Sequence, residues 1–144
     1  AIDSMHERVL LLRSTGLFPG SVRDNLTLGD DHIDRPQLQR ALEAAGVEEA
    51  VESLQDGLDT KLNRAGFPLN SEDQSRVLLA RALVLKPRLL IVDRVFDSLG
   101  VQERHAIIDE LFSNRRPWTV LYLTAHGHDH QGDTKRGRLE EVVA

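Results

Sequence analysis

The residue whose type and position most suggest a ligand-binding role is an aspartate at the end of a short apolar run. Asp93 closes the run Leu89–Asp93 (LLIVD), and such runs are typical of parallel strands buried on both faces. The carboxyl ends of parallel strands are where α/β sheets bind ligands. A carboxylate there can hold Mg²⁺, which prefers oxygen ligands. The alternative is that Asp93 is simply an acid that ends a strand.

Three alternating histidines form a second candidate group. His126, His128 and His130 would share one face of an extended strand, and imidazole is a common zinc ligand. The segment TAHGHDH is one residue short of the HxHxDH metal motif of the metallo-β-lactamase fold. Only 14 of the 144 residues follow His130, too few to supply the later ligands of that fold. The alternative is a solvent-exposed loop.

The composition excludes several classes of function. The formal net charge is −5, which disfavours a nucleic-acid partner held through its phosphates. There is no cysteine, so neither a disulfide framework nor a thiolate metal site is possible. No apolar run approaches the roughly 20 residues of a membrane span, and no signal peptide is visible. The first residue is Ala1, which we interpret as the start of a fragment or of a tag remnant.

The elements that must position these residues alternate between strands and helices. We expect strands over 8–13, 89–93 and 118–124, helices over 22–26, 35–45, 48–54, 71–85 and 101–112, and irregular stretches over 55–69 and 126–138. Ser21 and Asp34 are the expected N-caps of the first two helices, and Gly46 is the expected stop of the second. Ser71 and Gln74 match the capping-box spacing. This order predicts an α/β fold with a parallel sheet.

Five segments resemble those of ATP-binding cassette (ABC) ATPases and occur in the family's order. LFPGSVRDN (17–25) is similar to the stretch after the Q-loop, and GLDT (57–60) to the stretch before the signature. RVLLARAL (76–83) resembles the signature helix, PRLLIVD (87–93) the Walker B strand, and WTVLYLT (118–124) the strand before the H-loop. The resemblance covers about Arg8 to His126. It implies a partial P-loop NTPase fold, a parallel sheet flanked by helices with a helical subdomain.

The resemblance also implies a division of the chain. Residues 1–144 would be part of one nucleotide-binding domain, with 18–69 as the helical subdomain and the approach to the signature. Residues 70–126 would contain the signature helix, the Walker B strand and the H-loop strand, and 127–144 an irregular tail. In the family, the region between the Q-loop and the signature contacts the transmembrane subunit. Leu26–Leu54 is therefore expected to carry this coupling surface.

Several positions at which the family does chemistry carry other residues here. The P-loop pattern GxxxxGK[ST], which cradles nucleotide phosphates, does not occur in the sequence. Arg94 stands at the position of the catalytic glutamate, and a guanidinium cannot accept a proton at neutral pH. Arg13 stands at the Q-loop glutamine. Ala125 stands at the switch histidine, unless one inserted residue brings His126 into register.

The signature LSGGQ is also changed. The glycines of the family let backbone amides approach the γ-phosphate of a nucleotide on the partner subunit. Here the carboxylates of Glu72 and Asp73 would repel that phosphate. The alternative is structural, because acids stabilise a helix N-terminus. Gly100 stands at the D-loop aspartate, with Asp97 nearby. The residues at the signature position are Leu69, Asn70, Ser71, Glu72 and Asp73.

These departures imply a degenerate part of an ABC transporter, of the exporter type, that does not hydrolyse ATP alone. Its expected partners are a transmembrane domain and a second nucleotide-binding domain, on the cytoplasmic side of the membrane. The full-length protein would use ATP and Mg²⁺, with Asp93 as the magnesium ligand, while this chain alone would bind no cofactor. Two alternatives remain. One is a half-site that contributes to an active ATPase, and the other a metal-binding module built on His126, His128 and His130.

Overall fold

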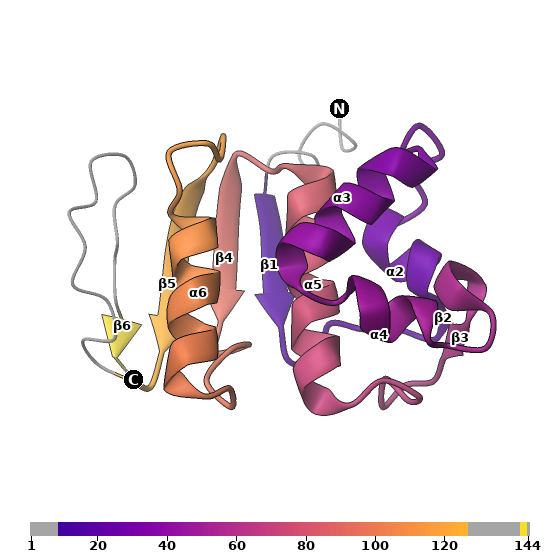
Figure 1. Cartoon of the computed structure of the whole chain (residues 1–144). Helices are drawn as coiled ribbons and strands as arrows, with labels where there is room; N and C mark the ends of the chain where they lie inside the picture. Colours follow the sequence, from indigo (N-terminus) through magenta and orange to yellow (C-terminus); the bar gives the residue numbers. More distant parts are fainter. Residues whose placement is uncertain (1–8, 127–141, 144) are drawn as a thin grey trace. The chain divides into compact units, whose positions relative to one another are not determined.

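The computed structural model describes residues 9–126 and the pair Val142–Val143 (Figure 1). The chain divides into two compact units. The sheet unit contains residues 1–14 and 86–144, and the helical unit contains residues 15–85. The predicted division of the chain into a helical subdomain ending at residue 69 is a functional one and stays a prediction. Within the described ranges, no helix has the length and apolar character needed to cross a bilayer.

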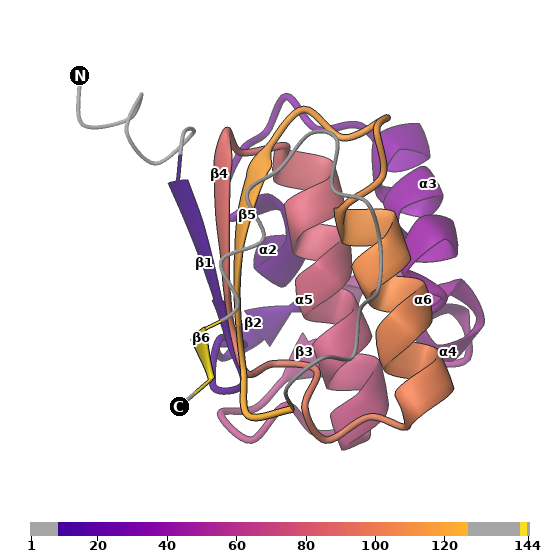
Figure 2. The same cartoon turned by 90° about the vertical axis from the view of Figure 1, so that its left-hand side faces the viewer.

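The sheet unit is built on parallel strands, as the sequence predicted. β1 (Val9–Arg13), β4 (Leu89–Asp93), β5 (Thr119–Thr124) and β6 (Val142–Val143) are ordered β1-β4-β5-β6. β6 lies within the stretch that we expected to be irregular. α6 (Val101–Leu111) connects β4 to β5 and lies on one side of the sheet (Figures 1 and 2).

Burial alternates along each strand of this sheet. Leu90 and Val92 are fully buried, whereas Leu89, Ile91 and Asp93 are half-buried. The neighbouring β1 follows the same alternation. Our expectation that LLIVD is buried on both faces is therefore wrong for one face, because no described element of the sheet unit covers it. The side chains exposed on that face of β1 include Val9 (45%) and Leu11 (40%).

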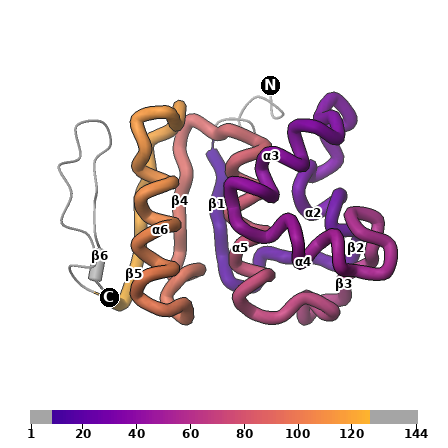
Figure 3. The backbone as a smooth tube through the Cα atoms, in the orientation of Figure 1, coloured from indigo at the N-terminus to yellow at the C-terminus, as the bar shows by residue number. Residues whose placement is uncertain are grey.

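Four helices and a small sheet form the helical unit. The helices are α2 (Val22–Thr27), α3 (Arg35–Ala45), α4 (Glu48–Glu52) and α5 (Ser71–Leu85), and α5 packs against α2 and α3 (Figure 3). Residues 55–69, expected to be a loop, include the 3₁₀ helix η1 (Gly57–Asp59) and β3 (Lys61–Leu62). β3 pairs antiparallel with β2 (Gly20–Ser21). This pairing joins segments far apart in sequence, so local patterns do not predict it.

The predicted caps of the first two helices are confirmed. Ser21 Oγ accepts the Asp24 N–H at 2.9 Å and the Asp24 carboxylate accepts the Ser21 N–H at 3.1 Å. The backbone hydrogen bond from Ser21 is also the main reason why the pKa of Asp24 lies below its ordinary value. Asp34 caps α3 by accepting the Gln37 N–H at 2.9 Å, and Gly46 ends the helix with φ 71°.

The predicted cap of α5 is wrong by one residue. Asn70 Oδ1, not the Ser71 hydroxyl, accepts the Asp73 N–H at 2.8 Å. The Gln74 amide does not return to the N-cap backbone, because it donates to the carbonyl oxygens of Ala65 (3.0 Å) and Leu69 (2.8 Å). This folds the preceding loop against the start of α5.

Candidate functional site

The carboxyl edge of the parallel sheet gathers four of the predicted site residues. β1 and β4 are adjacent strands (Figure 1), and their last residues, Arg13 and Asp93, are register partners, so the two side chains share one face of the sheet. Arg94 follows directly, and its backbone N–H donates to Leu123 O on β5 at 3.0 Å. His126 lies two residues beyond the end of β5. These residues belong to one unit, which brings them to one edge.

Arg94 has an unusual backbone conformation. Its φ is 56°, in the left-handed region that costs a residue other than glycine roughly 1–2 kcal/mol. Two backbone hydrogen bonds hold it there, from its N–H to Leu123 O and from the Asp97 N–H to its own carbonyl at 3.3 Å. Its side chain is exposed. In the described part of the chain, no ion pair joins Arg94 or Arg13 to Asp93.

Asp97 links the turn after β4 to the end of β5. Its Oδ1 accepts from the Thr124 hydroxyl at 2.7 Å, and its Oδ2 accepts from the Ala125 N–H at 2.9 Å. Its backbone carbonyl lies 3.0 Å from His126 Nε2. Because a carbonyl can only accept, Nε2 carries the proton in this contact. The structure thus gives the imidazole of His126 a fixed partner, a role for Asp97 that our sequence reasoning did not assign.

The residues at the signature position form the start of α5, in the helical unit. Leu69 is buried (5% exposed), and Asn70 is the N-cap. The Glu72 carboxylate pairs with Arg76 at 3.1 Å, one helical turn away. The two acids Glu72 and Asp73 lie in the first turn, where the helix dipole favours negative charge. In the sheet unit, Gly100 is the N-cap of α6.

The carboxyl edge does not fit a magnesium site. Asp93 offers one carboxylate, and both oxygens of Asp97 already accept hydrogen bonds. Arg13 is the register partner of Asp93 and Arg94 follows it in the chain, and positive charge at this edge disfavours a cation. Across residues 9–126, no group of three His, Asp or Glu side chains could hold a metal ion. His128 and His130 lie outside the described residues, so the histidine metal module stays a prediction.

Arg81 organises the segment that follows β1. It is 4% exposed, and its Nε donates to Asn25 O at 2.7 Å while its Nη2 donates to Gly16 O at 3.1 Å. Its guanidinium lies over the Phe18 ring, 5.8 Å from the centroid. Burial lowers its pKa to about 10, so it stays charged at neutral pH. The one sequence signal for this role was an arginine that interrupts an apolar helix.

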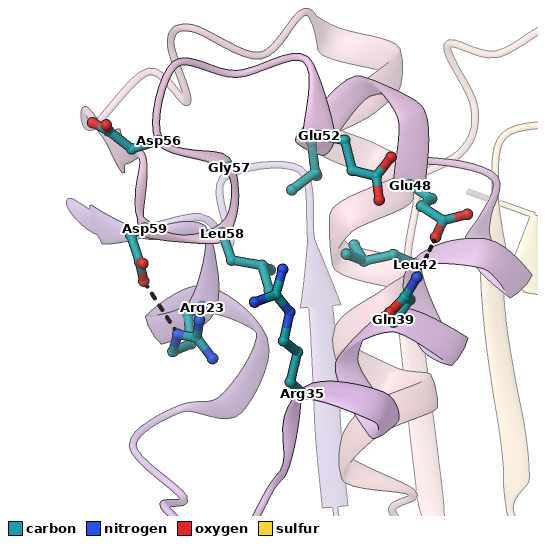
Figure 4. Close-up of a pocket in the computed structure, with 11 residues that line it drawn as sticks. Arg23, Arg35, Gln39, Leu42, Glu48, Glu52, Asp56, Gly57, Leu58 and Asp59 are labelled. Atoms are coloured by element: carbon teal, nitrogen blue, oxygen red, sulfur yellow. Dashed lines mark hydrogen bonds and ion pairs between the residues drawn. The ribbon is translucent and has the colours of Figure 1, made fainter.

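A cavity of about 230 Å³ lies in the helical unit, between α3, α4 and η1 (Figure 4). Leu42, Val51 and Leu58 contribute apolar surface to it. Two polar contacts lie at its wall, from Arg23 to Asp59 at 3.3 Å and from Gln39 to Glu48 at 3.1 Å. None of the site residues predicted from the sequence lines this cavity.

Comparison with known proteins identifies homologues. No model of a known family matches the chain. The ABC-type transmembrane transporter verA of Clonostachys rogersoniana is 31% identical over 128 residues, which is 87% of this chain and 10% of that protein. The mycobactin import ATP-binding/permease protein IrtB of Mycolicibacterium smegmatis is 36% identical over 110 residues, 76% of this chain and 19% of that protein. The homologues are thus ABC transporters, of whose length the chain spans a tenth to a fifth.

A solved structure supports the fold. A bacterial Atm1-family ABC exporter with ATP bound matches with a TM-score of 0.73 at 21% identity, over 88% of this chain and 22% of that one. The chain therefore has an α/β fold of the partial ABC ATPase type, with a parallel sheet and flanking helices.

Proposed function

We propose that this chain is the part of an ABC nucleotide-binding domain that follows the P-loop, and that it serves as a docking and regulatory module without hydrolysing ATP alone. The single observation that carries the proposal is Arg94, exposed at the carboxyl edge where the family places its catalytic glutamate. A guanidinium that stays protonated at neutral pH cannot activate water as a general base. Gly100 in place of the D-loop aspartate, and Ser71 and Glu72 in place of the two signature glycines, add to this support.

The proposed partners are a transmembrane domain and a second nucleotide-binding domain, on the cytoplasmic side of the membrane. In the assembled transporter, ATP and Mg²⁺ would be handled by sites completed by other segments. The cassette type is that of exporters, which the similarity to the Atm1-family structure supports. Because relatives named for import also occur, the proposal concerns the cassette type and not the direction of transport.

The docking surface lies within Leu26–Leu54. Leu28 at the C-cap of α2 is 48% exposed, although its neighbour Leu26 is fully buried. Its φ of 50° places a leucine in the left-handed region, which costs roughly 1–2 kcal/mol. An exposed apolar side chain held in a costly conformation favours a partner surface, because residues in such conformations cluster at functional sites.

We predict no magnesium-dependent ATP turnover by the isolated chain. The reason is that no P-loop cradles the phosphates and Arg94 cannot accept a proton. The measurement is phosphate release with excess Mg-ATP, with heat-denatured chain as the blank. Turnover above that blank contradicts the proposal.

The retained Asp93 favours a second candidate function, a half-site that contributes to an active ATPase in the full-length protein. Arg94→Glu in that protein separates the two functions. A rise in turnover means that the remaining site is assembled and supports the half-site. Unchanged turnover favours the docking module.

A single cysteine at position 28 tests the docking surface. The chain contains no cysteine, so Leu28→Cys gives one labelling site for a maleimide probe. We expect rapid labelling of the isolated chain and strong protection in the assembled transporter, because the partner would cover residue 28. Phe67→Cys is the matched control, since Phe67 is apolar, 69% exposed and outside the proposed surface. Equal labelling of residue 28 in both preparations would rule the surface out.

A further inference from the structure

The cavity between α3, α4 and η1 combines an apolar surface with charged walls. Leu42 and Val51 line it although they are buried (3% and 1% exposed), and the half-buried Leu58 adds further apolar surface. Its volume is about 230 Å³. A water molecule takes roughly 30 Å³ in the liquid, so the cavity has the volume of roughly eight water molecules. This volume suits a ligand of the size of a single amino acid and is below the about 300–1,000 Å³ of pockets for larger ligands.

Two opposite charges at this cavity have no partner in the protein. Arg35, the first residue of α3, and Glu52, the last residue of α4, both line it. Figure 4 shows the Arg35 side chain directed toward Leu58, and the Glu52 carboxylate on the side of Glu48. Among the residues that the structure describes, neither Arg35 nor Glu52 makes an ion pair or a side-chain hydrogen bond. Both charges are therefore available to a ligand that enters between them.

The other charged residues of the lining hold the cavity together or lie apart from it. Arg23 pairs with Asp59 at 3.3 Å, and the Glu48 carboxylate accepts from the Gln39 amide at 3.1 Å. These contacts join α2 to η1 and α3 to α4, so they hold the walls of the cavity without using its two unpaired charges. Asp56 is exposed, and its carboxylate is directed away from the other labelled side chains (Figure 4).

We propose that this cavity binds a free α-amino acid with an apolar side chain. The carboxylate of the ligand meets the guanidinium of Arg35, whose planar donors bind carboxylate oxygens in pairs. Its ammonium group meets Glu52, and its side chain covers the apolar surface of Leu42, Val51 and Leu58. A ligand with one sign of charge would bring a like charge to Arg35 or to Glu52, so a zwitterion fits better. This inference goes beyond the proposed docking function and does not depend on it.

Amide NMR spectra of the whole chain, titrated with leucine, test the inference. We expect shifts centred on α3, α4 and η1, with a dissociation constant of about 1 mM. Three analogues each lack one feature of the ligand: leucinamide lacks the carboxylate, N-acetyl-leucine lacks the ammonium group, and glycine lacks the apolar side chain. Each should bind about tenfold more weakly than leucine. If leucine causes no shifts around the cavity, or if any analogue binds as tightly as leucine, the inference is wrong.

Two variants assign the contacts of the ligand. In Arg35→Gln, leucine should bind about tenfold more weakly and no better than leucinamide, because the partner of its carboxylate is gone. In Glu52→Gln, leucine should lose its advantage over N-acetyl-leucine for the corresponding reason. Arg40→Gln and Glu49→Gln are the controls, since both residues are exposed, lie on the same two helices and do not line the cavity. An equal loss in a control and in its matched variant would mean nonspecific attraction and overturn the site. Far-UV circular dichroism confirms that all the variants are folded.

Discussion

Replacing Arg81 with methionine is expected to lower the unfolding free energy of the helical unit by roughly 3 kcal/mol. Methionine keeps an unbranched apolar stem of similar length but removes every donor. The backbone carbonyl of Asn25 would lose a buried hydrogen bond of 2.7 Å, and that of Gly16 a part-buried one of 3.1 Å. An unsatisfied buried acceptor costs about 1–3 kcal/mol, so the loss of both bonds outweighs the relief of no longer burying a charge.

Urea denaturation followed by far-UV circular dichroism measures this loss, because most of the described helices lie in the helical unit. Arg40→Met is the control. Arg40 is an exposed arginine on α3, and its replacement should change stability by less than about 0.5 kcal/mol. Arg81→Lys should fall between the two, since it keeps the charge but not the planar fork. If Arg81→Met and Arg40→Met unfold at the same urea concentration, the hydrogen bonds of Arg81 do not stabilise the unit.

Local patterns predicted the elements of this chain better than its long-range contacts. The caps at Ser21, Asp34 and Gly46 depend on residues within one helical turn, and all three are confirmed. The prediction of the α5 cap was wrong because Asn70 and Ser71 are equally good local candidates for the N-cap. The choice between them was decided by Gln74, whose amide reaches back to Ala65 across the preceding loop.

The same contrast between local patterns and long-range contacts holds for the residues of the candidate site. The strand pattern alone placed Asp93 at the carboxyl end of β4, and Arg94 followed from the sequence. The pairing of Arg13 with Asp93 depends on the register of strands 80 positions apart, which no local pattern contains. The hydrogen bonds of Asp97 to Thr124 and Ala125 could not be predicted, because they exist only once β4 and β5 are adjacent.

Replacing Asp97 with alanine is expected to destabilise the sheet unit by roughly 2 kcal/mol. Two hydrogen bonds to a carboxylate would be lost, one of them from the hydroxyl of Thr124, which is 4% exposed. Asp97 itself is half-buried, so solvent would offset part of this loss. Alanine keeps the backbone carbonyl that the His126 ring contacts, but the turn that positions this carbonyl would lose two hydrogen bonds, so the ring should also lose its fixed position.

The single tryptophan makes the first effect measurable. Trp118 belongs to the sheet unit, is 7% exposed and donates from its indole nitrogen to Leu111 O at 2.7 Å, so its fluorescence reports unfolding of this unit. Ser98→Ala is the control, because Ser98 is the exposed neighbour of Asp97 in the same turn and should change stability by less than about 0.5 kcal/mol.

The imidazole resonances of His126 report the second effect and should move toward those of a free histidine only in the Asp97 variant. Unchanged His126 resonances, with the stability of Asp97→Ala equal to that of Ser98→Ala, would mean that the end of β5 is held by the sheet alone. The histidine position at this edge would then need no support from the turn that follows β4.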